Sequence, residues 1–250
     1  DENISASGEF ALSDTDGDIS ADGSDAVGLS RDFDYRDNLV SHRPTDLTFA
    51  EAGSASTTAN TSTAGNQTAS QTTSLPDGKY AIVWVDASNG WSTRGRIYNE
   101  DGTAATSEFL ITVDGNNLGA PQDIITLANG SFAVSVQVAH NGTYYMGVVI
   151  IDENGTQTSD FYVNSFAYFT NIDETSDGNI VSVYTTTATT PASLVLEVHD
   201  QNGNQVVSPV TIDSDYTWLQ YAQVTALSNG DIVVGYRDGN AADHVLKIYS

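Results

Sequence analysis

One short stretch of the chain occurs four times, and this repetition most constrains what the chain can fold into. The first copy runs Leu75-Pro76-Asp77-Gly78-Lys79-Tyr80-Ala81-Ile82-Val83-Trp84-Val85. The turn glycines of the four copies, Gly78, Gly130, Gly178 and Gly230, lie 52, 48 and 52 residues apart. A fixed period of this size indicates a repeat architecture.

Each copy predicts a tight turn followed by a strand. Asp-Gly and Asn-Gly supply the positive φ values that primed hairpin turns need. The run that follows is β-branched and aromatic and has strand length. In the first copy both alternating faces are apolar, which predicts a strand covered on both sides.

Further strands complete each repeat. A second strand is expected at 92–98, 144–151, 193–199 and 244–249, and a third at 108–113, 160–164 and 206–212. A segment such as 121–127 leads into the next turn, so that each unit of about 50 residues holds four strands. The predicted fold is an all-β, propeller-like array of four-stranded antiparallel blades, four or five in number, with a β-sandwich as the alternative.

The two ends of the chain match the interior of the first repeat. Residues 97–109 begin with Ile-Tyr and end with Glu-Phe. Joining Ile248-Tyr249-Ser250 to residues 1–10 gives a second string of 13 residues that begins and ends in the same way. The last blade therefore lacks a strand that the N-terminus can supply. The predicted assembly residues are Glu9, Phe10, Ala11, Leu12, Val245 and Ile248.

Two outcomes remain open for this terminal strand. It can close the ring within one molecule and remove an open edge, which the sequence slightly favours. It can instead pair with a neighbouring molecule or repeat by strand exchange, giving an open-ended filament. The predicted organisation is a terminal strand at 1–12, an acidic insert or divergent blade at 13–58, and four repeated blades at 59–250.

Charge excludes several partners. The chain has 33 acidic residues against 8 Lys plus Arg, a net charge of −25. Binding to nucleic acid or to anionic membranes needs clustered Lys and Arg. No stretch approaches the ~20 apolar residues that cross a bilayer, so membrane insertion is not expected. Cysteine is absent, which excludes disulfides and thiolate metal sites.

The acidic N-terminal region holds the best candidate for a metal site. Alternating Asp side chains in a glycine-containing loop can converge on one hard cation, and Ca²⁺ takes six to eight oxygens. Ile19 stands where an EF-hand loop needs Gly, and no flanking helices are expected. A solvated acidic loop is the equal alternative. The predicted calcium ligands are Asp14, Asp16, Asp18, Ser20, Asp22 and Asp25.

Exposed aromatic residues offer a second candidate site. Trp91, Tyr144, Tyr145 and Trp218 are candidates for stacking on sugars, and core or inter-blade packing is the favoured alternative for most of them. No Gly-x-Ser-x-Gly nucleophile motif occurs, and no acid–base constellation stands out. A polysaccharide hydrolase or lyase is therefore the last alternative, and the chain is expected not to be an enzyme.

The first repeat resembles a known type of sequence. Residues 59–67 (Ala-Asn-Thr-Ser-Thr-Ala-Gly-Asn-Gln), 75–84 and Ser107-Glu108-Phe109-Leu110-Ile111 are similar to propeller-like repeats in large secreted bacterial proteins with hemolysin-type, calcium-binding repeats, including RTX adhesins. The resemblance covers about residues 59–250 and 1–12 and is weaker in the third repeat. It implies an extracellular or cell-surface location, cell adhesion, and a structural role stabilised by calcium.

Overall fold

The computed structural model describes the chain from residue 58 to its end, except for short gaps, and two short strands before it. The described ranges are 32–33, 39–41, 58–116, 119–140, 143–165, 167–186, 192–216, 222–238 and 243–250. The chain divides into two compact units, Asp1–Ala55 and Ser56–Ser250. In the first unit, β1 (Asp32–Phe33) pairs antiparallel with β2 (Leu39–Ser41).

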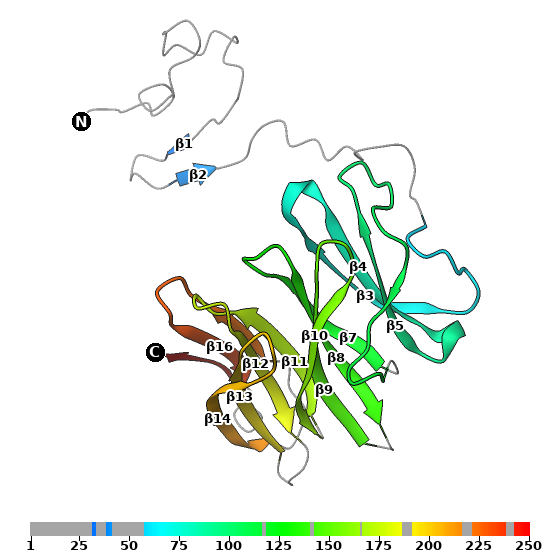
Figure 1. Cartoon of the computed structure of the whole chain (residues 1–250). Helices are drawn as coiled ribbons and strands as arrows, with labels where there is room; N and C mark the ends of the chain where they lie inside the picture. The colour runs from blue at the N-terminus through cyan, green and yellow to red at the C-terminus, as the bar shows by residue number, and fades with distance from the viewer. Residues whose placement is uncertain are drawn as a thin grey trace, which may run out of the picture. The chain divides into compact units, whose positions relative to one another are not determined.

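The second unit consists of four antiparallel sheets that follow one another along the chain (Figure 1). The first three sheets have four strands each, and the fourth has three. The first is formed by β3 (Gln67–Ser74), β4 (Tyr80–Asp86), β5 (Ser92–Tyr98) and β6 (Phe109–Leu110); the second by β7 (Gly119–Thr126), β8 (Phe132–His140), β9 (Thr143–Ile151) and β10 (Gln157–Ser165); the third by β11 (Ala167–Glu174), β12 (Ile180–Thr186), β13 (Ala192–His199) and β14 (Gln205–Tyr216); the fourth by β15 (Gln223–Ala226), β16 (Ile232–Arg237) and β17 (His244–Tyr249).

The predicted all-β class is confirmed, and the repeat spacing sets the sheet boundaries. Each predicted second strand is present within about a residue of its expected limits. The first sheet departs from prediction at its last strand, since β6 covers only Phe109–Leu110 where 108–113 is expected. Ile111 and Val113 are still buried there, so the segment packs on the sheet although it leaves the strand ladder. No helix in the described residues is long and apolar enough to span a membrane.

The four turns confirm that the glycine of each copy has a positive φ, but they do not share one turn type. Asp77 and Gly78 both have positive φ, 62° and 73°, as a primed turn requires. In the other three copies only Gly130, Gly178 and Gly230 have positive φ. Their backbone bonds, such as Gly130 N to Leu127 O and Leu127 N to Ser131 O, enclose a longer loop. A type I turn that ends in a left-handed glycine closes such a loop, so the Asn or Asp needs no positive φ.

The hydrophobic core lies between consecutive sheets. Ala81, Val83 and Ile97 of the first sheet share a cluster with Phe132 and Val134 of the second. A further cluster joins the second sheet to the third, and another joins the third to the fourth. Each inner sheet therefore buries one face against the preceding sheet and the other against the following sheet, which explains why the sequence is apolar on both faces of these strands.

The first strands of successive sheets also lie side by side. The Thr73 and Thr126 hydroxyls, on β3 and β7, are 2.8 Å apart. Asp173 on β11 accepts hydrogen bonds from Thr225 Oγ1 at 2.9 Å and Ala226 N at 2.8 Å on β15. Segment 67–74 is thus the first strand of its sheet.

Candidate functional site

The open edge of the fourth sheet is the feature that most distinguishes this sheet from the others. Among the described residues, β17 pairs with β16 alone, whereas β5, β9 and β13 each lie between two strands. Figure 1 shows β17 in dark red at the margin of its sheet, beside the C-terminus. A strand with a free edge presents unpaired N–H and C=O groups that can pair with another strand.

The side chains of β17 are far more exposed than their equivalents in the other three sheets. The register places Ile97, Ile150, Val198 and Ile248 at equivalent positions of the four sheets. The first three are 0%, 2% and 5% exposed, but Ile248 is 61% exposed. Leu246 is 66% exposed, whereas its equivalents Val148 and Leu196 are at most 3% exposed. We call Leu246 and Ile248 the open face of the fourth sheet.

The three complete sheets place their last strand in one register. Phe109 pairs with Gly95, Phe161 with Val148 and Val210 with Leu196. All three partners are equivalent to Leu246 of β17. The free edge of β17 therefore has a defined position at which a large apolar side chain is expected.

The packing of Phe109 and Phe161 shows how an aromatic ring fits this position in the first two sheets. A Cβ built on Gly95 lies 2.5 Å from the Phe109 ring, so only glycine fits beneath it. The same phenylalanine also approaches Gly155, in the outer turn of the second sheet, and Phe161 approaches Gly203 in the third. The last strand of a sheet thus also contacts the sheet that follows.

The structure covers only part of the predicted assembly site. Val245 and Ile248 lie on β17, and Val245 packs against the core between the third and fourth sheets. Glu9, Phe10, Ala11 and Leu12 lie outside the described residues. Ile248 is the predicted residue that contributes to the open face.

A row of polar side chains joins the first strands of the sheets. Asp123 Oδ2 accepts a hydrogen bond from Ile172 N at 3.0 Å and another from the Asn171 amide. Asn171 Oδ1 accepts from Val224 N at 2.7 Å. Burial raises the pKa of the Asp123 carboxyl, opposed by hydrogen bonds from the Ile172 and Ile124 backbones. These contacts hold the second sheet against the third and the third against the fourth.

The sequence analysis did not identify this row, although a signal existed. The equivalent residues Gln71, Asp123, Asn171 and Gln223 recur at 52, 48 and 52 residues, the spacing of the turn glycines. All four carry a side-chain carbonyl or carboxylate oxygen, which can accept a backbone N–H from the following sheet.

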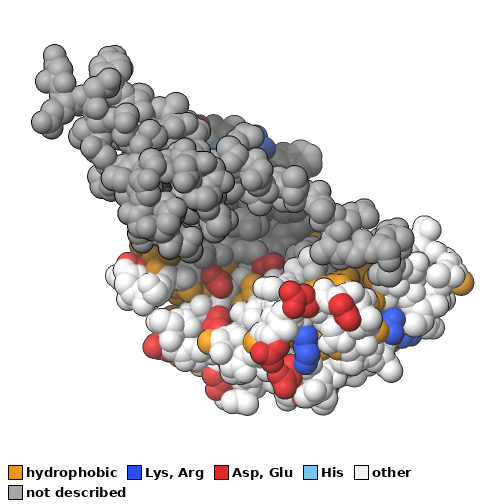
Figure 2. All heavy atoms as spheres, turned by 90° about the horizontal axis from the view of Figure 1, so that it is seen from above, with side chains coloured by type: hydrophobic (Ala, Val, Ile, Leu, Met, Phe, Trp, Pro, Cys, Tyr) orange, Lys and Arg blue, Asp and Glu red, His pale blue; other side chains and the backbone are white. Residues whose placement is uncertain are grey.

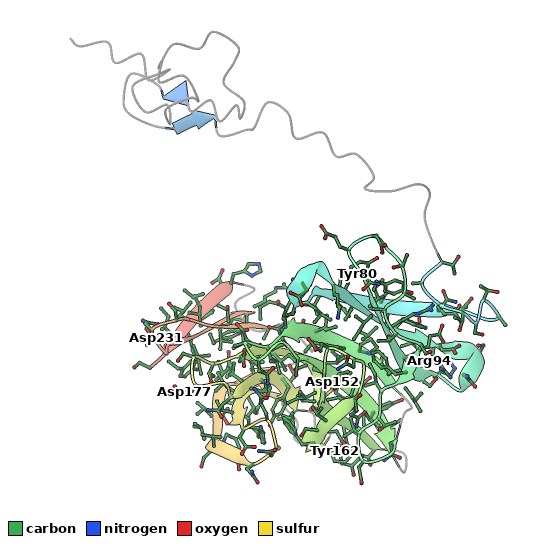
Figure 3. All side chains as sticks on the ribbon, turned by 45° about the horizontal axis from the view of Figure 1, so that its top comes forward. Tyr80, Arg94, Asp152, Tyr162, Asp177 and Asp231 are labelled. Carbon is green, nitrogen blue, oxygen red and sulfur yellow. The ribbon has the colours of Figure 1, made fainter. Side chains whose placement is uncertain are left out.

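A second polar network closes the first sheet. The Asp86 side chain is buried and accepts hydrogen bonds from Ser88 N at 3.1 Å and Ser88 Oγ at 2.6 Å. Its other oxygen lies 3.1 Å from Arg94 Nε, and Glu108 Oε2 lies 3.9 Å from the same guanidinium. The hydrogen bond from the Ser88 hydroxyl lowers the pKa of Asp86. Figure 3 shows Arg94, labelled, on this sheet.

Segment 58–62 extends the same network. Glu108 accepts hydrogen bonds from the backbone N–H and the hydroxyl of Thr61. The Ala59 carbonyl accepts from Tyr98 Oη and from Arg96. Trp84 and Tyr98, on the face that these residues adjoin, are 3% and 4% exposed. The face of the first sheet opposite the second sheet is therefore largely covered by residues of the same chain.

A third buried group lies between the second and third sheets. Tyr184 Oη donates to Glu197 Oε1 at 2.6 Å, and His199 Nε2 lies 3.8 Å from Glu197 Oε2. All three residues are buried, and the Phe161 ring is 5.3 Å from the His199 ring. Burial lowers the pKa of His199, partly opposed by the charges of Glu197 and Asp200. The Glu197 carboxylate thus accepts a hydrogen bond from Tyr184 and lies beside His199, both in its own sheet.

The structure describes three of the four predicted sugar-stacking residues, and their surroundings differ. Trp91 is 61% exposed with φ 63°, and Tyr144 is 46% exposed and packs against Tyr168 at 5.9 Å. Tyr145 packs against Tyr162, labelled in Figure 3, at 5.1 Å and is half-buried. Trp218 lies outside the described residues. Tyr144 packs against Tyr168 and Tyr145 against Tyr162, and Trp91 is the most exposed of the three candidates.

The predicted calcium ligands, Asp14, Asp16, Asp18, Ser20, Asp22 and Asp25, lie outside the described residues. Among the residues that are described, no group of three or more His, Asp or Glu side chains is placed to hold a metal ion. The turn carboxylates bind backbone instead: Asp152 Oδ1 accepts from Asn154 N and Thr156 N, and Asp200 does so from Asn202 N and Asn204 N. The face in Figure 2 shows acidic side chains beside apolar patches and a few basic side chains.

Comparison with known proteins concerns the fold alone. No family model and no curated protein matches the chain. A crystal structure of a protein of unknown function from Dyadobacter fermentans DSM 18053 matches with a TM-score of 0.51 and 11% identity, covering 70% of this chain and 50% of that one. The Hadza microbial sialidase Hz136 matches with a TM-score of 0.50 and 12% identity, covering 73% and 44%. This chain therefore spans half or less of the length of these two proteins.

Proposed function

We propose that this chain is a non-enzymatic structural or adhesion module of a secreted or cell-surface bacterial protein, and that it joins to its surroundings through the open edge of β17. The observation that carries this proposal is the contrast between Ile248, 61% exposed, and its buried equivalents in the three complete sheets. A sheet with a free edge and an uncovered apolar face is a site for strand addition. The location rests on the resemblance of residues 59–84 and 107–111 to adhesin repeats.

The proposed architecture is a series of propeller-like blades. Sheets that bury both faces against their neighbours, with their first strands side by side, support this reading over a two-sheet sandwich. The terminal strand then completes the last blade, either by closing a ring or by linking subunits.

A non-enzymatic role is supported by the use of the buried carboxylates. Asp86, Asp123 and Glu197 each hold neighbouring strands or sheets together. A polysaccharide hydrolase or lyase is the rival, and a 12% identical sialidase supports only a shared fold. Incubation with a panel of polysaccharides and sialylated glycans tests this rival. Product formation abolished by Asp123→Asn would replace the structural proposal.

Calcium is proposed to stabilise the first unit through Asp14, Asp16, Asp18, Ser20, Asp22 and Asp25. Bound Ca²⁺ would also relieve repulsion within a chain of net charge −25. Titration calorimetry should show Ca²⁺ binding that Asp16→Asn with Asp18→Asn removes, while the matched double change Asp152→Asn with Asp200→Asn keeps it. Equal binding by both double variants, or none by the unaltered chain, would exclude this site.

A lectin-like module is the second candidate function, and the exposed Trp91 favours it. Its ring is 61% exposed and its backbone has positive φ, an uncommon and costly conformation for a large residue. A glycan array should then give hits that Trp91→Ala removes and Tyr145→Phe retains. An array without hits would remove this candidate.

The joining role is tested by measuring molar mass against concentration. Light scattering should show the full-length chain growing in mass with concentration. Leu246→Asp, which places a charge on the open face, should raise the concentration needed at least tenfold. Glu153→Gln, on an exposed turn, is the control. A mass that stays at 26.5 kDa over the whole range would reject the joining role.

A further inference from the structure

We propose that residues 7–12 of a second copy of this chain add to the free edge of β17 as the missing strand, with Phe10 opposite Leu246. This inference rests on the proposed joining role and names its partner and register. Three observations carry it: the shared register of the complete sheets, the sequence of residues 7–12, and the open face.

The shared register fixes the pairing. Residues equivalent to Leu246 pair with Phe109, Phe161 and Val210. Phe109 and Phe161 each follow an acidic residue, in Ser107-Glu108-Phe109 and Ser159-Asp160-Phe161. Residues 7–10 read Ser-Gly-Glu-Phe, so Phe10 has the same acidic neighbour. Placing Phe10 in the position of Phe161, whose partner Val148 is also a branched residue, puts it opposite Leu246.

The resulting pairs are complementary. In an antiparallel pair with Phe10 opposite Leu246, Glu9 lies opposite Lys247 and Ala11 opposite Val245. Glu9 and Lys247 then form an opposite-charge cross-strand pair, which is stabilising. Because side chains alternate, Phe10 and Leu12 lie on the side of Leu246 and Ile248 and extend that apolar surface. A register slipped by one residue would move both apolar side chains to the other side.

The open face favours a second copy over the same molecule. In the complete sheets, the residues equivalent to Leu246 and Ile248 are covered both by a last strand and by the following sheet. The first sheet of the same chain leaves Ile248 61% and Leu246 66% exposed. A second copy brings its strand and, further along its chain, sheets that can cover this face. Residues 7–12 and β17 are two different parts of the chain, so the proposed contact propagates head to tail.

Disulfide trapping tests the register and the source together. The chain has no cysteine, so two introduced cysteines are its only thiols. Phe10→Cys with Leu246→Cys should oxidise to a ladder of covalent multimers that a reductant collapses. The matched pair Phe10→Cys with Lys247→Cys, slipped by one residue, should give at least tenfold less. Circular dichroism melting verifies that both variants are folded.

Each other result overturns the proposal. A disulfide closed within one chain would assign the strand to its own molecule. Equal cross-linking of the two pairs, or none by either, would reject the register. Growth in mass of the unaltered chain without a Phe10–Leu246 link would refute this pairing and leave the joining role intact. A strictly monomeric unaltered chain would remove the joining role itself.

Discussion

The first and fourth sheets occupy opposite ends of the described series, and the chain treats the two ends differently. In the first sheet, Asp86, Arg94 and Glu108 form a polar network that segment 58–62 joins, and Ile97 is fully buried. In the fourth, β17 has a free edge and exposes Leu246 and Ile248. The repeat thus gives equivalent positions opposite environments, since Ile97 is buried and Ile248 is exposed. This difference is the observation on which the proposed joining role depends.

The largest effect should come from truncating the equivalent isoleucines. Ile97→Ala opens a cavity in the core between the first two sheets and should lower the free energy of unfolding by about 2–5 kcal/mol. Ile248→Ala removes an exposed side chain and should change it by less than about 0.5 kcal/mol in dilute solution. Urea denaturation of both variants measures the difference. Similar losses in dilute solution would mean that Ile248 is already covered.

The polar network of the first sheet should have the next largest effect. Asp86→Asn keeps the size of the side chain but removes the charge paired with Arg94, which should cost about 2 kcal/mol. Asp101→Asn removes the same charge from an exposed turn and is the control. Thermal melting distinguishes them. Equal melting temperatures of the two variants would mean that the network does not stabilise the fold.

The decrease in stability at low pH should depend on the same carboxyl, that of Asp86. The pKa of Asp86 is lowered in the folded chain, so its contribution is fully present above the ordinary pKa of 3.8 and is lost as the pH falls toward the lowered value. Asp86→Asn should therefore lose less stability than the unaltered chain between pH 5 and pH 3, compared with Asp177→Asn at an exposed turn position. Parallel acid limbs would contradict this role.

A smaller effect is expected from His199, which is buried between the second and third sheets. Because burial lowers the folded pKa of His199, its contribution is present above the ordinary pKa of 6.5 and is lost as the pH falls toward the folded value. His199→Gln should weaken the loss of stability between pH 7 and pH 5, whereas His244→Gln, at an exposed position on β17, should leave it unchanged. Identical pH profiles for the two variants would show that His199 titrates as if exposed.

The sequence predicts features that depend on a few neighbouring residues better than features that depend on how strands pair. The turn at Asp77-Gly78 and the strand after it follow from positive φ and an apolar pattern, and both were predicted. An incomplete last sheet was also predicted, because residues 248–250 and 1–10 copy the spacing of 97–109, and the fourth sheet has three described strands. That residues 1–12 supply the fourth strand stays a prediction. The turn types of the later copies depend on how the two flanking strands pair, which a dipeptide does not determine.

Contacts between sheets were harder to predict. Tyr184, Glu197 and His199 meet because β12 and β13 pair in a given register and a neighbouring sheet covers them, and no spacing in the sequence shows this. The row through Asp123 and Asn171 was recoverable, because it follows the turn period. The exposure of Trp91 could not be distinguished from core packing, since aromatic residues serve both roles in these sheets.

Hydrogen–deuterium exchange of β17 as a function of protein concentration tests the central claim most directly. The claim is that β17 has a free edge that takes up a strand from a second copy. The amides of 244–249 that point away from β16 should exchange rapidly in dilute solution and become protected as the concentration rises, while the hydrogen-bonded amides of 92–98 stay protected throughout. Protection of 244–249 that is complete in dilute solution, or that never changes with concentration, would contradict the claim.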